Sequence, residues 1–184
     1  MKNKSLLLHP LDKNEQPDID RLIQALRGIR FIDAVLDETE NRFLVGDDFL
    51  KLITFLGCSP NVELAPTGDN GAFCHVSLVQ TQPQLLTSAH TRNPRCPACR
   101  KDAASLSVII SAMQARDAKQ WQCTSCSETV DIQNMNWRHT AGNAGFFVEI
   151  SNIFPDEAVP SDELMSALQK ATNSKWDYFY YYNQ

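Results

Sequence analysis

The chain has 184 residues and a formal net charge of −5, with 43% hydrophobic and 21% charged residues, which are ordinary proportions for a globular protein. No run of 18 apolar residues occurs, which argues against a helical membrane span, and the apolar run after the basic N-terminus is too short for a secretion signal. We therefore expect a cytoplasmic protein whose single core is large enough to carry an insertion.

The first half of the chain predicts alternating strands and helices. Residues 4–9 are expected to form a strand, residues 17–28 a helix with apolar positions at helical spacing, and residues 31–36 a second strand. Residues 43–45 predict a further short strand. A second helix is expected over residues 47–57, capped by its first residue and ended by its last.

The second half repeats this order. After a loop at residues 66–71, residues 72–79 predict a strand, and residues 145–151 predict another one rich in Phe and Val. A long connector leads to a helix capped by Ser161, and residues 175–182 form an expected aromatic strand. The pattern predicts an α+β fold with two β-α-β halves, for which a ferredoxin-like sandwich is one arrangement.

Four of the six cysteines form two C-x-x-C pairs, Cys96 with Cys99 and Cys123 with Cys126. Each pair places two thiolates on one tight turn, and two such turns close a four-cysteine shell around Zn²⁺. The shell leaves no open position for a substrate, so the metal is expected to be structural. We therefore predict a zinc ribbon with these four cysteines as its ligands.

The stretch between the two pairs, residues 100–122, is slightly longer than usual for this pattern and fits two short strands and a connector. Within it residues 103–115 are ambiguous, because a β-branched run favours a strand and the alanines around it allow a helix. Trp121 is expected to cover the small core of the ribbon. We expect the ribbon to span residues 90–140 and the α+β body to comprise residues 1–89 and 141–184.

Other uses of the cysteines explain the sequence less well. A disulfide framework needs an oxidising compartment, and nothing here indicates secretion. The first pair has the spacing of a thioredoxin-like redox site, but the residues before it are turn-like, and redox chemistry leaves the second pair unexplained. Cys74 is expected to be a small buried residue, and Cys58 carries no further signal.

The arrangement Cys-Pro-Ala-Cys…Cys-Thr-Ser-Cys resembles the zinc ribbons of many transcription and translation proteins. The resemblance covers residues 96–126 and implies a bound zinc ion, without specifying a function. The chain as a whole looks like a bacterial protein that carries a ribbon.

The ribbon is the basic part of the chain. Seven Lys and Arg against four Asp and Glu give residues 90–140 a charge of +3, and the total of −5 leaves −8 for the rest. A zinc site with four thiolates contributes −2, so the metal-bound ribbon would be near +1, which is weak for the capture of a phosphate backbone. The sequence therefore favours a non-enzymatic zinc-binding protein that contacts a protein partner. The aromatic C-terminal strand, as a sheet edge, could also pair with a second copy of the chain.

Two alternatives stay open. The first is a nucleic-acid-binding module using residues of the basic ribbon, namely Arg95, Arg100, Lys119, Trp137 and Arg138. Residues 145–150 also faintly resemble the aromatic strand of RNA-recognition domains, although a buried strand explains the same residues. The second alternative is an enzyme with a site between the two β-α-β halves, but no phosphate-binding loop, nucleophile elbow or paired-histidine motif is present.

Overall fold

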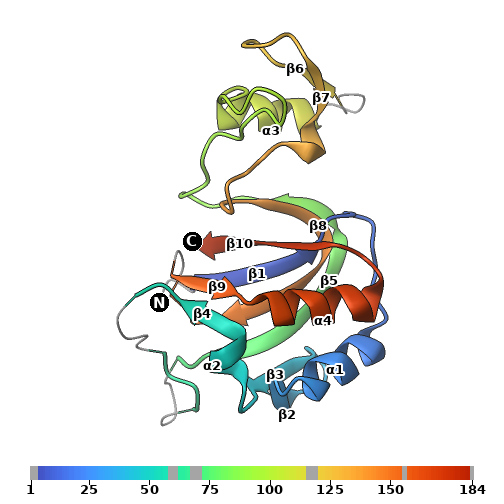
Figure 1. The fold of residues 1–184 in the computed structure, drawn as a ribbon, viewed down its shortest axis with the longest axis vertical. Coiled ribbons are helices and arrows are strands. Elements are labelled where there is room, and N and C mark those ends of the chain that lie inside the picture. Colours follow the sequence, from blue (N-terminus) through green and yellow to red (C-terminus); the bar gives the residue numbers. More distant parts are fainter. Residues whose placement is uncertain (1–3, 58–61, 67–71, 115–119, 155–156, 183–184) are drawn as a thin grey trace.

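The computed structural model describes residues 4–57, 62–66, 72–114, 120–154 and 157–182. Figure 1 shows a larger body built on the main sheet and, at one end of it, a smaller unit that contains α3, β6 and β7. The predicted α+β class is confirmed, because helices pack against an antiparallel sheet. Within the described ranges, no helix combines the length and the apolar character that crossing a membrane requires.

The elements follow the chain in two groups. Those before the small unit are β1 (Lys4–Pro10), α1 (Ile19–Gly28), β2 (Ile32–Asp37), β3 (Arg42–Val45), α2 (Phe49–Leu52), β4 (Ile53–Phe55) and β5 (His75–Leu86). The rest are α3 (Leu106–Gln114), β6 (Gln120–Gln122), β7 (Thr129–Asp131), the 3-10 turn η1 (Ile132–Asn134), β8 (Gly142–Ser151), β9 (Ala158–Pro160), α4 (Asp162–Thr172) and β10 (Trp176–Tyr182).

The main sheet has the strand order β10-β1-β8-β5-β3-β2, and all neighbouring strands are antiparallel. As a result β1 runs parallel to β5 with β8 between them, and β8 runs parallel to β10 with β1 between them. Helix α1 follows β1, and α4 joins β8 to β10, so two split β-α-β units interlock as a ferredoxin-like arrangement requires. The first unit is larger than predicted, because β2, β3, α2 and β4 come between α1 and β5.

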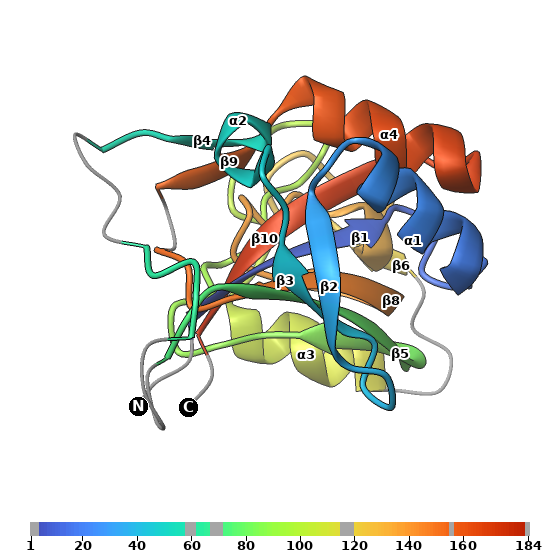
Figure 2. The same cartoon turned by 90° about the horizontal axis from the view of Figure 1, so that it is seen from below.

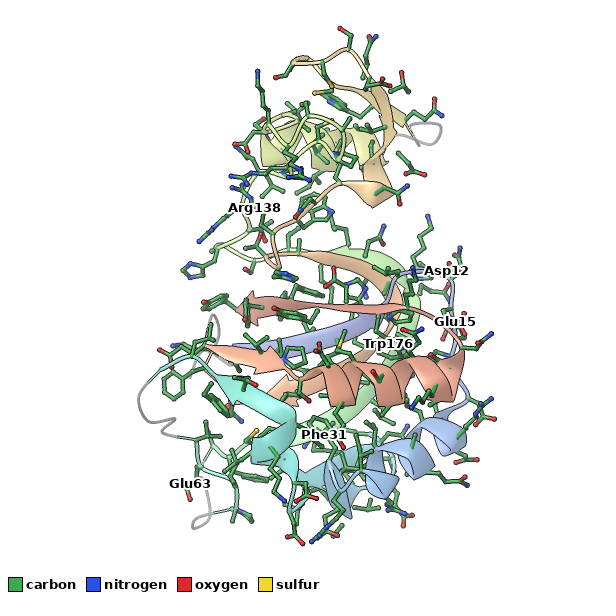
Figure 3. The ribbon with its side chains drawn as sticks, viewed as in Figure 1. Asp12, Glu15, Phe31, Glu63, Arg138 and Trp176 are labelled. Atoms are coloured by element: carbon green, nitrogen blue, oxygen red, sulfur yellow. The ribbon has the colours of Figure 1, made fainter. Side chains whose placement is uncertain are left out.

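Helices α1 and α4 cover the same face of this sheet, above it in Figure 2. The side chain of Asp18 caps α1 by accepting the N–H of Arg21, and Ser161 caps α4, as predicted, by accepting the N–H of Leu164. The apolar side of each helix meets the inward side chains of the strands. This core includes the fully buried residues Leu6, Leu8, Leu22, Leu26, Phe31, Phe146, Val148, Leu164 and Leu168. Figure 3 marks Phe31 and Trp176 in the body.

The hairpin of β5 and β8 extends beyond the rest of the sheet, and the small unit is inserted at its tip. After a register shift between Gln80 and Gln84, pairing continues through residues 84–86 and 142–144, which we call the hairpin arm. The arm lies against the face opposite the helices. A Cβ atom added at Gly142 would stand 2.3 Å from Phe179 Cε1, so only glycine allows this close approach.

The predicted helix over residues 47–57 is wrong. Only Phe49–Leu52 are helical, and residues 53–55 form β4, which pairs with β9 from the connector expected to be a loop. Phe49, Leu52 and Ile53 are all buried, and apolar spacing cannot distinguish a short buried helix from a short buried strand. The strand predicted over residues 72–79 begins later and runs to Leu86, while the loop predicted at 66–71 lies almost wholly outside the described residues.

The ribbon also differs from the prediction of two short strands between the cysteine pairs. Residues 106–114 form α3, and β6 is the strand described before the second pair. In α3 Ile109 is fully buried, whereas Val108 next to it is exposed. The ribbon core therefore covers one side of this segment, which suits a helix despite the β-branched residues. Asn93 stabilises its start, since its Oδ1 accepts the N–H of Leu106 at 2.9 Å.

Candidate metal centre

The first cysteine pair lies on a tight turn between two short bridges. Arg95 pairs with Asp102 and Asn136, which fixes the chain on entry. The N–H of Cys96 then donates to Lys101 O, and the N–H of Arg100 donates to Cys96 O, both at 2.9 Å. Arg100 has a φ of 63°, in the left-handed region that reverses the chain after the second cysteine.

The second pair repeats this turn at the tip of the β6–β7 hairpin. The N–H of Cys123 donates to Glu128 O, and the N–H of Ser127 donates to Cys123 O, both at 2.8 Å. Ser127 has a φ of 60°. Two segments far apart in the chain thus adopt one backbone geometry, and each directs both of its thiols to the same side. Sequence reasoning considered Arg100 only for nucleic-acid binding and missed the part that Arg100 and Ser127 play in the two turns. Their shared place directly after each pair was the available signal.

The four sulfur atoms form one cluster in which every pair lies within 4.8 Å. The Sγ atoms of Cys96 and Cys126 are 3.9 Å apart, and those of Cys99 and Cys123 are 3.8 Å apart. Zn–S bonds of about 2.3 Å at tetrahedral angles place neighbouring sulfurs about 3.8 Å apart. A disulfide would bring two sulfurs to about 2.05 Å. The cluster could therefore hold one metal ion.

The electrostatics of the cluster also suit a cation. The backbone N–H groups of Ser125 and Cys126 point at the Cys123 sulfur and lower the pKa of that thiol to about 7. The N–H of Glu128 lowers the pKa of Cys126, but burial and the neighbouring sulfurs outweigh it and raise this pKa to about 12. The Cys123 thiol therefore ionises readily, whereas ionisation of the Cys126 thiol is unfavourable beside the other sulfurs. A bound cation offsets this unfavourable charge.

A small apolar core of the ribbon packs against the cysteine cluster. Cys96 and Cys123 are buried in it, and Trp121 packs against it as predicted. Its other buried members come from α3, β7, η1 and the segments that lead into α3 and β8. They are Ala103, Ile109, Val130, Ile132, Met135, Trp137 and Ala141. Packing therefore holds Cys96 and Cys123 in place, whereas Cys99 and Cys126 are partly exposed.

The other cysteines lie apart from the cluster. Cys74 is fully buried in the body, and this burial raises the pKa of its thiol to about 12, which agrees with the inert core residue expected from the sequence. Cys58 lies outside the described residues.

Four of the five residues of the nucleic-acid hypothesis lie within the described ranges. Arg95 and Arg138 both lie close to Asp102, with N–O distances of 3.8 and 3.9 Å. The Trp137 ring is 8% exposed, because it belongs to the ribbon core, and Arg100 is exposed on its turn. Lys119 lies outside the described residues. Figure 3 places Arg138 at the base of the ribbon, where the ribbon meets the body.

The enzyme hypothesis places a site between the two halves. A cavity of about 390 Å³ lies between the ribbon and the body. Its lining includes His9, His139 and Asp177, and none of the described residues that line it is a Ser, Thr, Cys or Lys that could act as a nucleophile. Burial lowers the pKa of His9, so this imidazole stays neutral around pH 7.

Comparisons with protein families, with curated proteins and with solved structures give no match for this chain. The resemblance to zinc ribbons therefore rests on the cysteine cluster and its two turns. The expected likeness of the whole chain to a bacterial family has no support.

Proposed function

We propose that this chain is a non-enzymatic zinc-binding protein in which Cys96, Cys99, Cys123 and Cys126 hold a structural Zn²⁺ ion. The observation that carries the proposal is the sulfur spacing of 3.8–3.9 Å across the two turns. Four thiolates fill a tetrahedral shell, so the ion has no open position for a substrate or water. Its role is to fix the ribbon, because metal binding of this kind is coupled to folding.

Metal analysis of the whole chain tests this proposal. Protein prepared without added metal should contain about one zinc per chain, and thiol titration should show four additional reactive thiols once a chelator removes it. Cys99→Ser should abolish stoichiometric zinc. Cys74→Ser is the matched control, because Cys74 is also free in the structure but lies in the body, and this variant should keep its zinc. Absence of zinc from the unaltered protein would refute the proposal.

The ribbon is further proposed to be a protein-interaction module. Its helix α3 carries no charged residue, and Val108 on it is 45% exposed beside the exposed Ser107 and Ser111. An uncharged helix face at the far end of the molecule suits an apolar protein surface better than a phosphate backbone. The structure favours the nucleic-acid alternative less, because two of its arginines lie beside Asp102 and its tryptophan is buried.

A photo-crosslinking residue at position 108 tests the interaction role. The matched control carries the same residue at position 35 in β2, because Val35 is 41% exposed but lies in the body. We expect a discrete adduct with one protein from position 108 only, and its loss when Cys99→Ser is added. Equal adducts from both positions, or none from position 108, would contradict the proposal.

A further inference from the structure

Two chain segments connect the ribbon to the body and run beside the outer edge of β10. These segments, residues 88–92 and 137–141, are called here the ribbon stem. They are joined to each other, since Thr91 Oγ1 donates to Thr140 O at 2.9 Å and the N–H of Arg92 donates to Thr140 Oγ1 at 3.1 Å. The stem therefore acts as one unit where it meets the sheet.

The stem occupies backbone groups at the edge of β10. His139 Nδ1 lies 2.8 Å from Tyr178 O, which fixes Nδ1 as the donor, and the N–H of Tyr180 donates to His139 O at 2.9 Å. The His139 ring stacks on the Tyr178 ring, with centroids 4.1 Å apart and planes 8° apart. Further along, the centroid of the His90 ring lies 4.2 Å from that of Tyr182. One residue of the stem thus takes the place of a neighbouring strand.

The backbone of the stem is held in an unfavourable conformation. Arg138 and His139 are consecutive residues with φ values of 54° and 55°, in the left-handed region that residues other than glycine adopt uncommonly and, two in succession, more rarely still. Such a conformation persists only where surrounding contacts determine it. The bonds to Tyr178 and Tyr180 are the contacts that hold His139 there.

The edge under the stem is well suited to pairing with itself. β10 is the outer strand of the sheet and has the sequence WDYFYYY, with Asp177 as its single charge. In an antiparallel pair of two β10 strands centred on Phe179, Tyr178 faces Tyr180 of the other copy, and Asp177 faces Tyr181. No like charges oppose each other, and aromatic pairs across strands are stabilising. Such a two-fold interface is self-complementary.

We propose that the outer edge of β10 is an interface for a second copy of this chain, and that the zinc-bound ribbon keeps it closed through His139 and His90. The zinc link rests on the proposed function. Trp137 and Ala141, on either side of His139, belong to the same core as Cys96 and Cys123. Loss of the metal therefore loosens the stem, and the released edge pairs with that of another molecule.

The oligomeric state of the full chain, measured by sedimentation, tests this proposal. The zinc-bound protein should be a monomer of 20.7 kDa. Removal of zinc should give a dimer. The double variant His90→Ala/His139→Gly should also dimerise while it keeps its zinc. Glycine adopts a positive φ without strain, and the variant loses the ring contacts and the Nδ1 bond to Tyr178 O that cover the edge. We expect dimerisation to tighten by about tenfold or more.

Two controls separate this interface from others. His75→Ala removes a histidine from β5, away from this edge, and should stay monomeric. Tyr178→Pro added to the double variant removes an outward N–H from an edge strand and should restore the monomer. A monomeric double variant, or a dimer that survives Tyr178→Pro, would overturn the proposal. If the unaltered protein bound no zinc, the proposed function would fail, whereas the double variant would still test the interface.

Discussion

Cys99→Ser is expected to unfold the ribbon and to leave the body folded. Domains have stabilities of about 0.05–0.15 kcal/mol per residue, so a ribbon of residues 90–140 would hold about 3–8 kcal/mol in total. A structural zinc site contributes about 10 kcal/mol or more. Without the metal the small ribbon core cannot maintain its fold. The body keeps a separate and larger core between the sheet, α1 and α4.

The three tryptophans allow the two parts to be observed separately. Trp137 lies in the ribbon core and Trp176 in the body core, and each is 8% exposed. With Trp121→Phe as background, variants that keep only one of these two should report ribbon and body independently. On zinc loss the emission of Trp137 should shift to the red while that of Trp176 stays unchanged. The far-UV helix signal should fall by about a quarter, since α3 has 9 residues against 10 in α1, 4 in α2 and 11 in α4.

Cys74→Ser gives the opposite pattern and is the control. Cys74 is fully buried among apolar residues of the body, where a serine hydroxyl would cost about 1–3 kcal/mol. Denaturant unfolding followed by Trp176 should therefore show a lower midpoint, with zinc content unchanged. Trp137 and Trp176 could instead report a single shared transition when a chelator removes zinc from chains with all six cysteines. Ribbon and body would then be one cooperative unit, which contradicts independent folding of the body.

The thiol cluster, one glycine and one buried histidine each give a further prediction. Zinc affinity should fall as pH is lowered from about 8 to 6, because binding displaces protons from thiols such as Cys126, whose pKa is about 12 without metal; chelator competition that is independent of pH would contradict this. Gly142→Ala should cost about 1–3 kcal/mol of unfolding free energy, since its Cβ would clash with Phe179, whereas Gly28→Ala, with no atom within 4 Å, should be neutral or stabilising. Burial lowers the folded-state pKa of His9, so the unfolded chain binds the proton more tightly and stability should fall as pH drops below about 6.5. In thermal melts, His9→Gln should make stability depend less on pH. An unchanged pH dependence in this variant would contradict the prediction.

The metal ligands could be read from the sequence because the chemistry depends on local spacing. A C-x-x-C segment is short enough to fold back on itself, and this brings the two sulfurs of each pair close together. Long amphipathic elements were predictable for a similar reason: α1 and α4 each show one apolar side and a capping residue before the first turn. In these cases the information lies within a few residues of the feature that it determines.

Elements decided by distant partners could not be found in this way. Residues 53–55 form a strand because β9, about a hundred residues later, supplies its pairing groups. In α3 the β-branched run favours a strand, yet the ribbon core that covers Ile109 on one side makes a helix the better solution. Local preference is weak in both segments, so tertiary packing decides their structure.

The position of His139 follows from topology. The ribbon interrupts the connection between β5 and β8, and β8 is separated from β10 in the sheet only by β1. The chain that returns from the ribbon to β8 therefore passes close to the outer edge of β10. An aromatic edge strand at this place would otherwise expose its backbone to other chains. Because the stem has to pass this edge, a single residue, His139, is enough to cover it. Zinc binding in the ribbon is thereby coupled to whether the β10 edge is covered or open.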